Sequence, residues 1–215
     1  MNSLLPYFGV LLKGAFVTLE LSALALLFSF VIGTLLGMGA TSRVTPLRVI
    51  VKLYVEAVRS VPLLVQLFFA YYALPLVLGV NLSPYGAATL ALSVYAGAFM
   101  SEAVRSGIES VGRDQWAAAR SLAMGYRLTM LYIVAPQALR VTLPAASGIF
   151  IDLLKGASLT SIIGFVELLQ TAVNVRNVTF TIAPLLAAGV LYFIMCFGLA
   201  RVGYRIERAL QYGGR

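Results

Sequence analysis

Long apolar runs alternate with short polar stretches along the chain. A helix needs roughly 20 mainly apolar residues to cross the hydrocarbon core of a bilayer. Five runs approach or exceed this length, and they cover residues 10–39, 53–79, 86–108, 130–154 and 183–204. The pattern predicts an all-α integral membrane protein in which residues 1–215 form a single transmembrane domain.

The polar stretch between the third and fourth runs predicts a short amphipathic helix over residues 113–125. Gly112 is placed to end the preceding helix, and Asp114 is placed to cap the new one. Trp116 and its small neighbours lie roughly on one side, and arginines lie around the rest. Such a helix can lie on lipid or in a groove of a soluble protein, and the spacing leaves both readings open.

Composition excludes an ordinary soluble domain, because 60% of the residues are hydrophobic, 11% are charged and the mean hydropathy is +0.93. The basic residues that give the net charge of +8 are unevenly distributed along the chain. Basic residues fill residues 43–52, 105–127 and 201–215, whereas Gly79–Tyr85 carries no charge. By the positive-inside bias, the N-terminus lies outside and the C-terminus in the cytoplasm. The basic residues therefore indicate orientation, and no nucleic-acid partner is expected.

Catalytic and cofactor signatures do not occur in the sequence. It has no histidine, one cysteine (Cys196), and no GxxxxGK[ST], GxSxG or HExxH motif. The carboxylates are scattered along the chain rather than paired. We therefore expect no catalytic, cofactor or metal site on this chain, which is not an enzyme by itself.

Several polar or small residues interrupt the apolar runs. Gly33 and Gly37 form a GxxxG spacing, which serves either packing within the chain or contact between subunits. The pentapeptide EAVRS occurs at both 56–60 and 102–106, and its Glu and Arg can pair on one helix face. The amide of Gln66 is expected to face the bundle interior or a partner subunit.

Asp152 and Lys155 stand three residues apart in the fourth run. Each is costly to bury alone in hydrocarbon. They either pair with each other or meet the ammonium and carboxylate of a zwitterionic substrate. With Ser158 and Gln66, they are the candidate residues of a substrate path.

Four sequence blocks occur in order: YVEAVRSVPLLVQLFFAYYALP, GAFMSEAVRSGIESV, DQWAAARSLAMGYRLTMLYIVAPQALRVTLP and FIDLLKGASLTSIIGFVELL. They resemble the permease subunits of ABC importers for polar amino acids, of the histidine, glutamine and arginine uptake type. The resemblance implies a type I importer-like subunit in the bacterial cytoplasmic (inner) membrane. It also implies two ATPase subunits that carry ATP and Mg, a second permease subunit, and an extracytoplasmic amino-acid-binding protein.

The resemblance makes the 113–125 helix a coupling helix that docks on the ATPase. The residues it assigns to this contact are Asp114, Trp116, Ala117, Ala118, Arg120, Leu122, Ala123 and Gly125.

Five positions depart from the family pattern: alanine replaces its glutamate at 117, its glycine at 123, its leucine at 135 and its threonine at 157, and glycine replaces its asparagine at 148. A glutamate at Ala117 would complete a capping box with Asp114 and offer an anion to the ATPase. Without it, either the helix docks through Arg120, Asp114 and its shape, or the chain pairs with a sister permease that keeps the glutamate; a sister chain is slightly favoured over an identical one. The alternative function is a secondary transporter or channel subunit that needs no ATPase.

Overall fold

The computed structural model describes residues 5–212, and four segments there are long and apolar enough to cross a membrane. They are α1 (Phe8–Ala40), α5 (Pro84–Glu109), the stretch Tyr126–Ile163 and α10 (Ala183–Tyr212). The third stretch comprises α7 (Tyr126–Thr129), a π-helical turn η3 (Met130–Val134), α8 (Ala135–Ala157) and a 3₁₀ turn η4 (Ser158–Ile163). Large apolar side chains of α1 and α10, such as Phe16 and Phe193, are exposed and face outward as lipid-facing residues do.

The segment predicted as one continuous span over 53–79 is broken in the structure. Helix α2 begins at Thr45 and ends at Ser60 (Thr45–Ser60), and the chain then turns by 100°. The second part consists of α3 (Leu63–Phe68), a π-helical turn η2 (Phe69–Ala73) and α4 (Leu74–Leu78). Pro62 causes the break, because the residue before a proline avoids the helical region, and Val61 is extended at φ −92° and ψ 127°. The bent pair can form a fifth crossing.

Helices α1 and α5 pack closely through small residues. A Cβ atom built on Gly33 would lie 2.5 Å from Met100 Cβ, and one on Gly37 would lie 2.8 Å from Val104 Cβ. Both glycines are buried within the chain. The GxxxG spacing therefore serves packing between α1 and α5, which confirms the intramolecular reading and leaves the glycines no part in a subunit contact.

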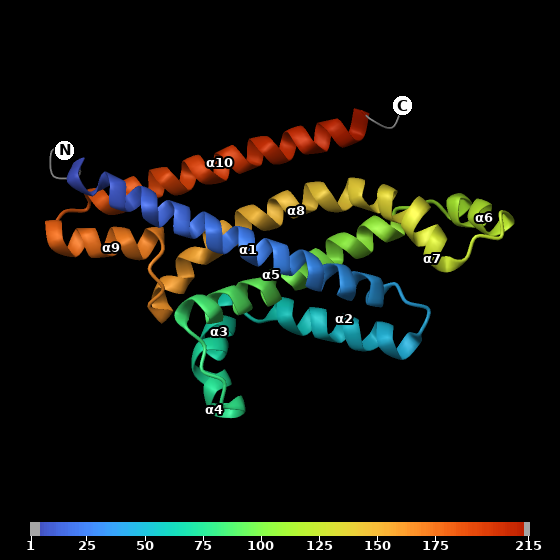
Figure 1. Cartoon of the computed structure of the whole chain (residues 1–215), viewed down its shortest axis with the longest axis horizontal. Helices are drawn as coiled ribbons and strands as arrows, with labels where there is room; N and C mark the ends of the chain where they lie inside the picture. Colours follow the sequence, from blue (N-terminus) through green and yellow to red (C-terminus); the bar gives the residue numbers. More distant parts are fainter. Residues whose placement is uncertain (1–4, 213–215) are drawn as a thin grey trace.

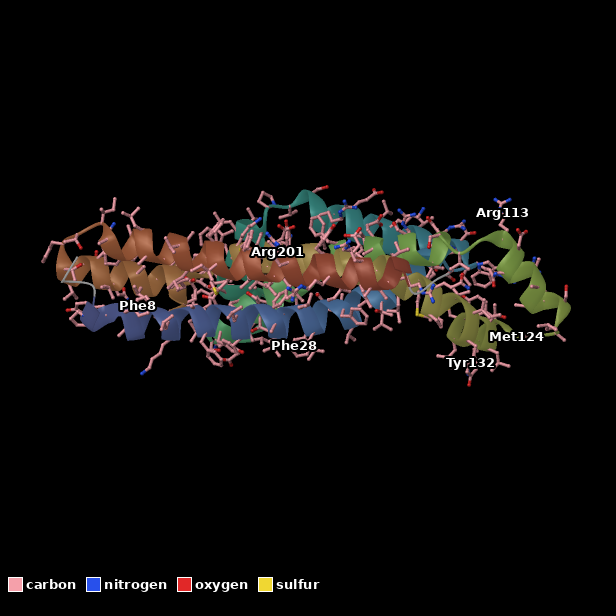
Figure 2. All side chains as sticks on the ribbon, turned by 90° about the horizontal axis from the view of Figure 1, so that it is seen from above. Phe8, Phe28, Arg113, Met124, Tyr132 and Arg201 are labelled. Atoms are coloured by element: carbon pink, nitrogen blue, oxygen red, sulfur yellow. The ribbon has the colours of Figure 1, made fainter. Side chains whose placement is uncertain are left out.

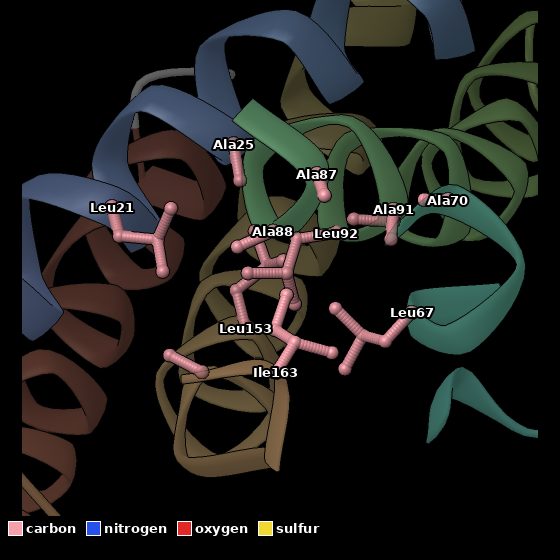
Figure 3. Close-up of a cluster of buried hydrophobic side chains, with 12 residues drawn as sticks. Leu21, Ala25, Leu67, Ala70, Ala87, Ala88, Ala91, Leu92, Leu153 and Ile163 are labelled. Carbon is pink, nitrogen blue, oxygen red and sulfur yellow. The ribbon is translucent and has the colours of Figure 1, made fainter. Parts of the chain in front are cut away.

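A buried apolar cluster holds the bent segment in place. Leu21 of α1, Leu67 of α3, Leu92 of α5, Leu153 of α8 and Ile163 of η4 all belong to it (Figure 3). Helix α1, helix α5 and the continuous stretch of α8 and η4 thus meet around α3. This cluster fixes the position of α3 against the long helices.

The molecule is elongated, and a short helix stands near each end (Figure 1). Helix α6 (Arg113–Ser121) is at one end, which we call the α6 end; Arg113 and Met124 mark it in Figure 2. Helix α9 (Leu168–Thr179) lies at the other, the α9 end, beside the starts of α1 and α10 and near Phe8. The two short helices are therefore separated by the full length of the long helices.

Candidate functional site

Helix α6 projects beyond the long helices at the α6 end. It begins at Arg113 and ends at Ser121, so it is shorter than the predicted range 113–125. Gly112 is its N-cap residue, with φ −54°, and does not end α5 in a left-handed conformation; α5 stops earlier, at Glu109. Asp114 lies in the first turn, where no side chain makes a capping bond. The predicted roles of Gly112 and Asp114 at the helix ends were therefore wrong.

Two side chains attach α6 to the rest of the protein. Ala119 is buried, and Trp116 packs against the cluster formed by Val111, Val134 and neighbouring residues. The Trp116 ring also stacks on Tyr126, with ring centroids 6.2 Å apart. Trp116 was predicted to contact a partner, but it is only partly exposed because its ring packs inside the chain.

The remaining predicted coupling residues are exposed. They are Asp114, Ala117, Ala118, Arg120, Leu122, Ala123 and Gly125. Leu122 is the most apolar of them and 74% of it is accessible. Small residues beside one exposed leucine form a narrow, low-relief surface, which is the shape that can enter a groove of another protein.

The turn at the end of α6 contains Ala123, where the family pattern has glycine. Ala123 adopts φ 54°, the left-handed region that favours glycine. Its N–H donates to the Arg120 carbonyl over 2.9 Å, and the Met124 N–H donates to the Ala119 carbonyl over 3.0 Å. The backbone thus keeps the turn that a glycine would form more easily, and alanine bears the strain.

The capping explanation for the missing glutamate at Ala117 fails. Ala117 is the fifth residue of α6, and the capping partner would have to be the third. The exposure of Ala117 leaves contact with a partner as the role that a glutamate could play there.

The candidate path residues separate into two sites. Gln66 lies at the bend between α2 and α3, where its amide nitrogen donates to the carbonyl oxygens of Val58 at 2.8 Å and Val61 at 3.0 Å. These carbonyls stand at the end of α2, where helical partners are missing. The amide nitrogen of Gln66 therefore stabilises the bend.

Asp152 and Lys155 lie together on α8. Lys155 Nζ stands 3.8 Å from Asp152 Oδ1, and the two side chains are 63% and 74% exposed. An ion pair so exposed contributes only ~0–1 kcal/mol. Ser158 Oγ donates to the Lys155 carbonyl over 2.7 Å. The pair forms, yet both charged groups keep a free side that could meet a ligand or a neighbouring subunit.

Beside this pair is a charged network that the sequence only suggested. Glu102 accepts from Arg105 Nη2 at 2.8 Å, and Arg59 of α2 approaches it to 4.0 Å. The Arg59 guanidinium also lies 5.1 Å from the centre of the Phe99 ring. Phe99 and Asp152 line one small hollow. The two EAVRS copies thus meet across α2 and α5, and their identical sequence was the available signal.

A second polar cluster at the α9 end was not predicted. Glu167 is fully buried and caps α9 by accepting from the N–H groups of Leu169 at 2.8 Å and Gln170 at 2.9 Å. It also accepts from the Tyr192 hydroxyl at 2.6 Å and from Thr18 Oγ1 at 3.4 Å. Burial raises the pKa of the Glu167 carboxyl, although the hydrogen bonds oppose this shift. The Glu167 cluster ties α9 to α1 and α10.

Comparisons with known proteins agree with this architecture. The family model described as "Binding-protein-dependent transport system inner membrane component" matches residues 29–212. The L-cystine transport system permease protein TcyB of Bacillus subtilis (strain 168) is 36% identical over 207 residues, covering 95% of this chain and 88% of the relative. The probable glutamine ABC transporter permease protein GlnP of the same strain is 34% identical over 205 residues, 94% of each chain.

Solved structures give the same result. A crystal structure of an amino acid ABC transporter with histidines superposes with a TM-score of 0.89 at 32% identity, covering 97% of both chains. An inward-facing structure of the MetNI methionine ABC transporter gives a TM-score of 0.84 at 22% identity, covering 96% and 98% of the chains, which supports the fold alone. The helical architecture is thus that of type I ABC importer permeases. This chain belongs to the family of binding-protein-dependent transport system inner membrane components, and it is a transmembrane permease subunit of an ABC importer.

Proposed function

We propose that this chain forms half of the translocation path of an amino-acid importer and couples it to a separate ATPase through α6. Relatives named for cystine, glutamine and arginine transport support the substrate class. The observation that carries the coupling role is the exposed face of α6, which projects past the long helices. ATP binding would draw two ATPase subunits together, and α6 would transmit that closure to the spans.

We place the α6 end in the cytoplasm and the α9 end outside. The distribution of basic residues supports this orientation, because Arg113, Arg120 and Arg127 gather around α6. The chain would cross the bacterial inner membrane with its N-terminus outside. A cysteine placed at Thr181 in a Cys196→Ser background should react with an impermeant maleimide in intact cells, and one placed at Ala118 should react only after permeabilisation.

The coupling role can be tested with two substitutions on opposite ends of the molecule. Arg120→Glu reverses a charge on the exposed face of α6, and Arg176→Glu does so on α9. In the purified complex, ATP hydrolysis stimulated by the binding protein and its amino acid should fall at least ~tenfold for Arg120→Glu, as expected for an interface residue of high importance. If uptake and stimulation survive Arg120→Glu unchanged, α6 does not carry the coupling.

We propose that Asp152, Lys155 and Ser158 line the substrate path. Gln66 would act at the border of this path, because its amide stabilises the bend between α2 and α3. A zwitterionic amino acid offers an ammonium for Asp152 and a carboxylate for Lys155. Asp152→Asn and Lys155→Met separately should each reduce uptake, and the double variant should remain defective if both groups bind substrate. Recovery of uptake in the double variant would show that the two residues act only as a pair.

The second permease is proposed to be a sister chain that keeps a glutamate at the position of Ala117. Co-purification from cells that express the neighbouring genes, followed by mass spectrometry of the intact complex, distinguishes this from an identical pair.

A further inference from the structure

A polar groove lies where the ends of α1 and α5 meet the first half of α2 and the start of α6. Its volume is about 560 Å³. Its basic lining residues are Arg48 and Lys52 from α2 and Arg113 from α6, and the Trp116 side chain also borders it. Three cations from two separate helices thus converge on one open hollow, and the coupling role of α6 does not explain this arrangement.

The one acid that lines the groove is already engaged. Glu109 Oε2 accepts from Arg105 Nη1 at 2.6 Å. Within residues 5–212, no carboxylate comes within ion-pair distance of Arg48, Lys52 or Arg113. The groove therefore carries an excess of positive charge.

Another acid, Glu102, interacts with Lys52 only at longer range. Its close contacts are with Arg105 at 2.8 Å and with Arg59 at 4.0 Å. Because Glu102 is shared among these groups, it leaves the positive charge of the groove largely in place.

The two α2 cations are placed unfavourably within their own helix. Arg48 and Lys52 are four residues apart on one helix face, where like charges repel. They stand in the first half of Thr45–Ser60, and a helix dipole favours cations at the opposite end. An external anion would remove this repulsion.

Exposed apolar residues next to the cations point to the source of the anion. Val49 lies three residues before Lys52 and four before Leu53, so Val49 and Leu53 form an exposed apolar stripe that borders the positive charge on α2. Trp116 supplies the amphipathic ring that is enriched where membrane and water meet. A ligand with a charged head and an acyl tail satisfies both surfaces.

We propose that this groove binds the phosphate headgroup of an anionic glycerophospholipid, such as phosphatidylglycerol. The assignment to the cytoplasmic leaflet rests on the proposed orientation, but binding itself does not. The headgroup phosphate would lie between Arg48, Lys52 and Arg113, and an acyl chain would lie along Val49 and Leu53.

Native mass spectrometry of the complete purified complex tests the proposal, with phosphatidylglycerol or phosphatidylcholine added in detergent. The wild type should retain phosphatidylglycerol in preference to phosphatidylcholine. Arg48→Gln/Lys52→Gln leaves α6 unaltered and should weaken this retention by about 25-fold, since each basic residue near an anionic surface contributes roughly fivefold. The control Arg140→Gln/Arg205→Gln removes two exposed charges outside the groove and should change retention little.

Three results would overturn the proposal: equal retention of both lipids by the wild type, an equal loss in the control pair, or displacement of the lipid by millimolar inorganic phosphate that then stays bound. The last result would identify a free phosphate rather than a lipid. Because binding is measured without ATP or substrate, a failure of the proposed transport function would leave this measurement unaffected.

Discussion

Two short helices at opposite ends of the molecule, α6 and α9, each have an acidic residue near their start. Glu167 of α9 is buried and accepts hydrogen bonds that join three helices. Asp114 of α6 is exposed and caps nothing. The α9 end is thus fixed by buried polar contacts, whereas α6 is attached mainly by Ala119 and Trp116. This difference is what a permease needs if a partner moves one end while the other keeps its shape.

The largest expected effect is the difference in stability between replacing Glu167 and replacing Asp114. Glu167→Ala removes the α9 cap and leaves the Tyr192 hydroxyl buried without its acceptor, so it should lower stability by about 3 kcal/mol. Asp114→Ala removes an exposed charge near a helix start and should cost less than ~1 kcal/mol. Thermal unfolding of the purified complex measures both. Equal shifts in melting temperature would contradict the proposed contrast between the ends.

A second prediction uses the pH dependence of the buried acid. Because burial raises the pKa of Glu167, its favourable contribution is complete below its ordinary value of 4.5 and declines as the pH rises from there through the raised value. Glu167→Gln cannot ionise, so the melting temperature of wild type minus that of Glu167→Gln should fall over this pH interval. A flat difference would show that Glu167 keeps an ordinary pKa.

Loosening α6 should have a moderate and local effect. Trp116→Ala removes the stacking on Tyr126, worth about 0.5–1.5 kcal/mol beyond the buried area. We expect amide exchange in α6 to accelerate while amides of α9 keep their protection. Tyr126→Ala, which breaks the same contact from the other side, should give the same local change.

The smallest expected effect concerns the end of α6. Ala123→Gly relieves the left-handed strain at φ 54°, but it also increases the entropy of the unfolded chain. We expect a net stabilisation below ~1 kcal/mol, visible as slower amide exchange of Met124. Ala118→Gly, in the body of the helix, should accelerate exchange instead.

The long spans were predictable because their apolar runs match the thickness of a bilayer, and the motif blocks identified the family. The bend at Pro62 was harder to predict, because the apolar run continues across it. Hydropathy reports how apolar a segment is and does not report whether the chain changes direction within it. The cap at Asp114 was mispredicted, since an exposed Gly112 can begin a helix without any side-chain bond. Glu167 was overlooked because its partners, Thr18 and Tyr192, are distant in sequence.

We propose above all that α6, and not the α9 end, docks on the ATPase. A photo-reactive benzoylphenylalanine at Leu122, which is 74% exposed, can be compared with one at Phe180, which is 90% exposed at the end of α9. After illumination of membranes that contain the whole transporter, the residue at position 122 should crosslink to the ATPase and the residue at position 180 should not. Crosslinking to the ATPase from position 180, or its absence from position 122, would contradict the claim.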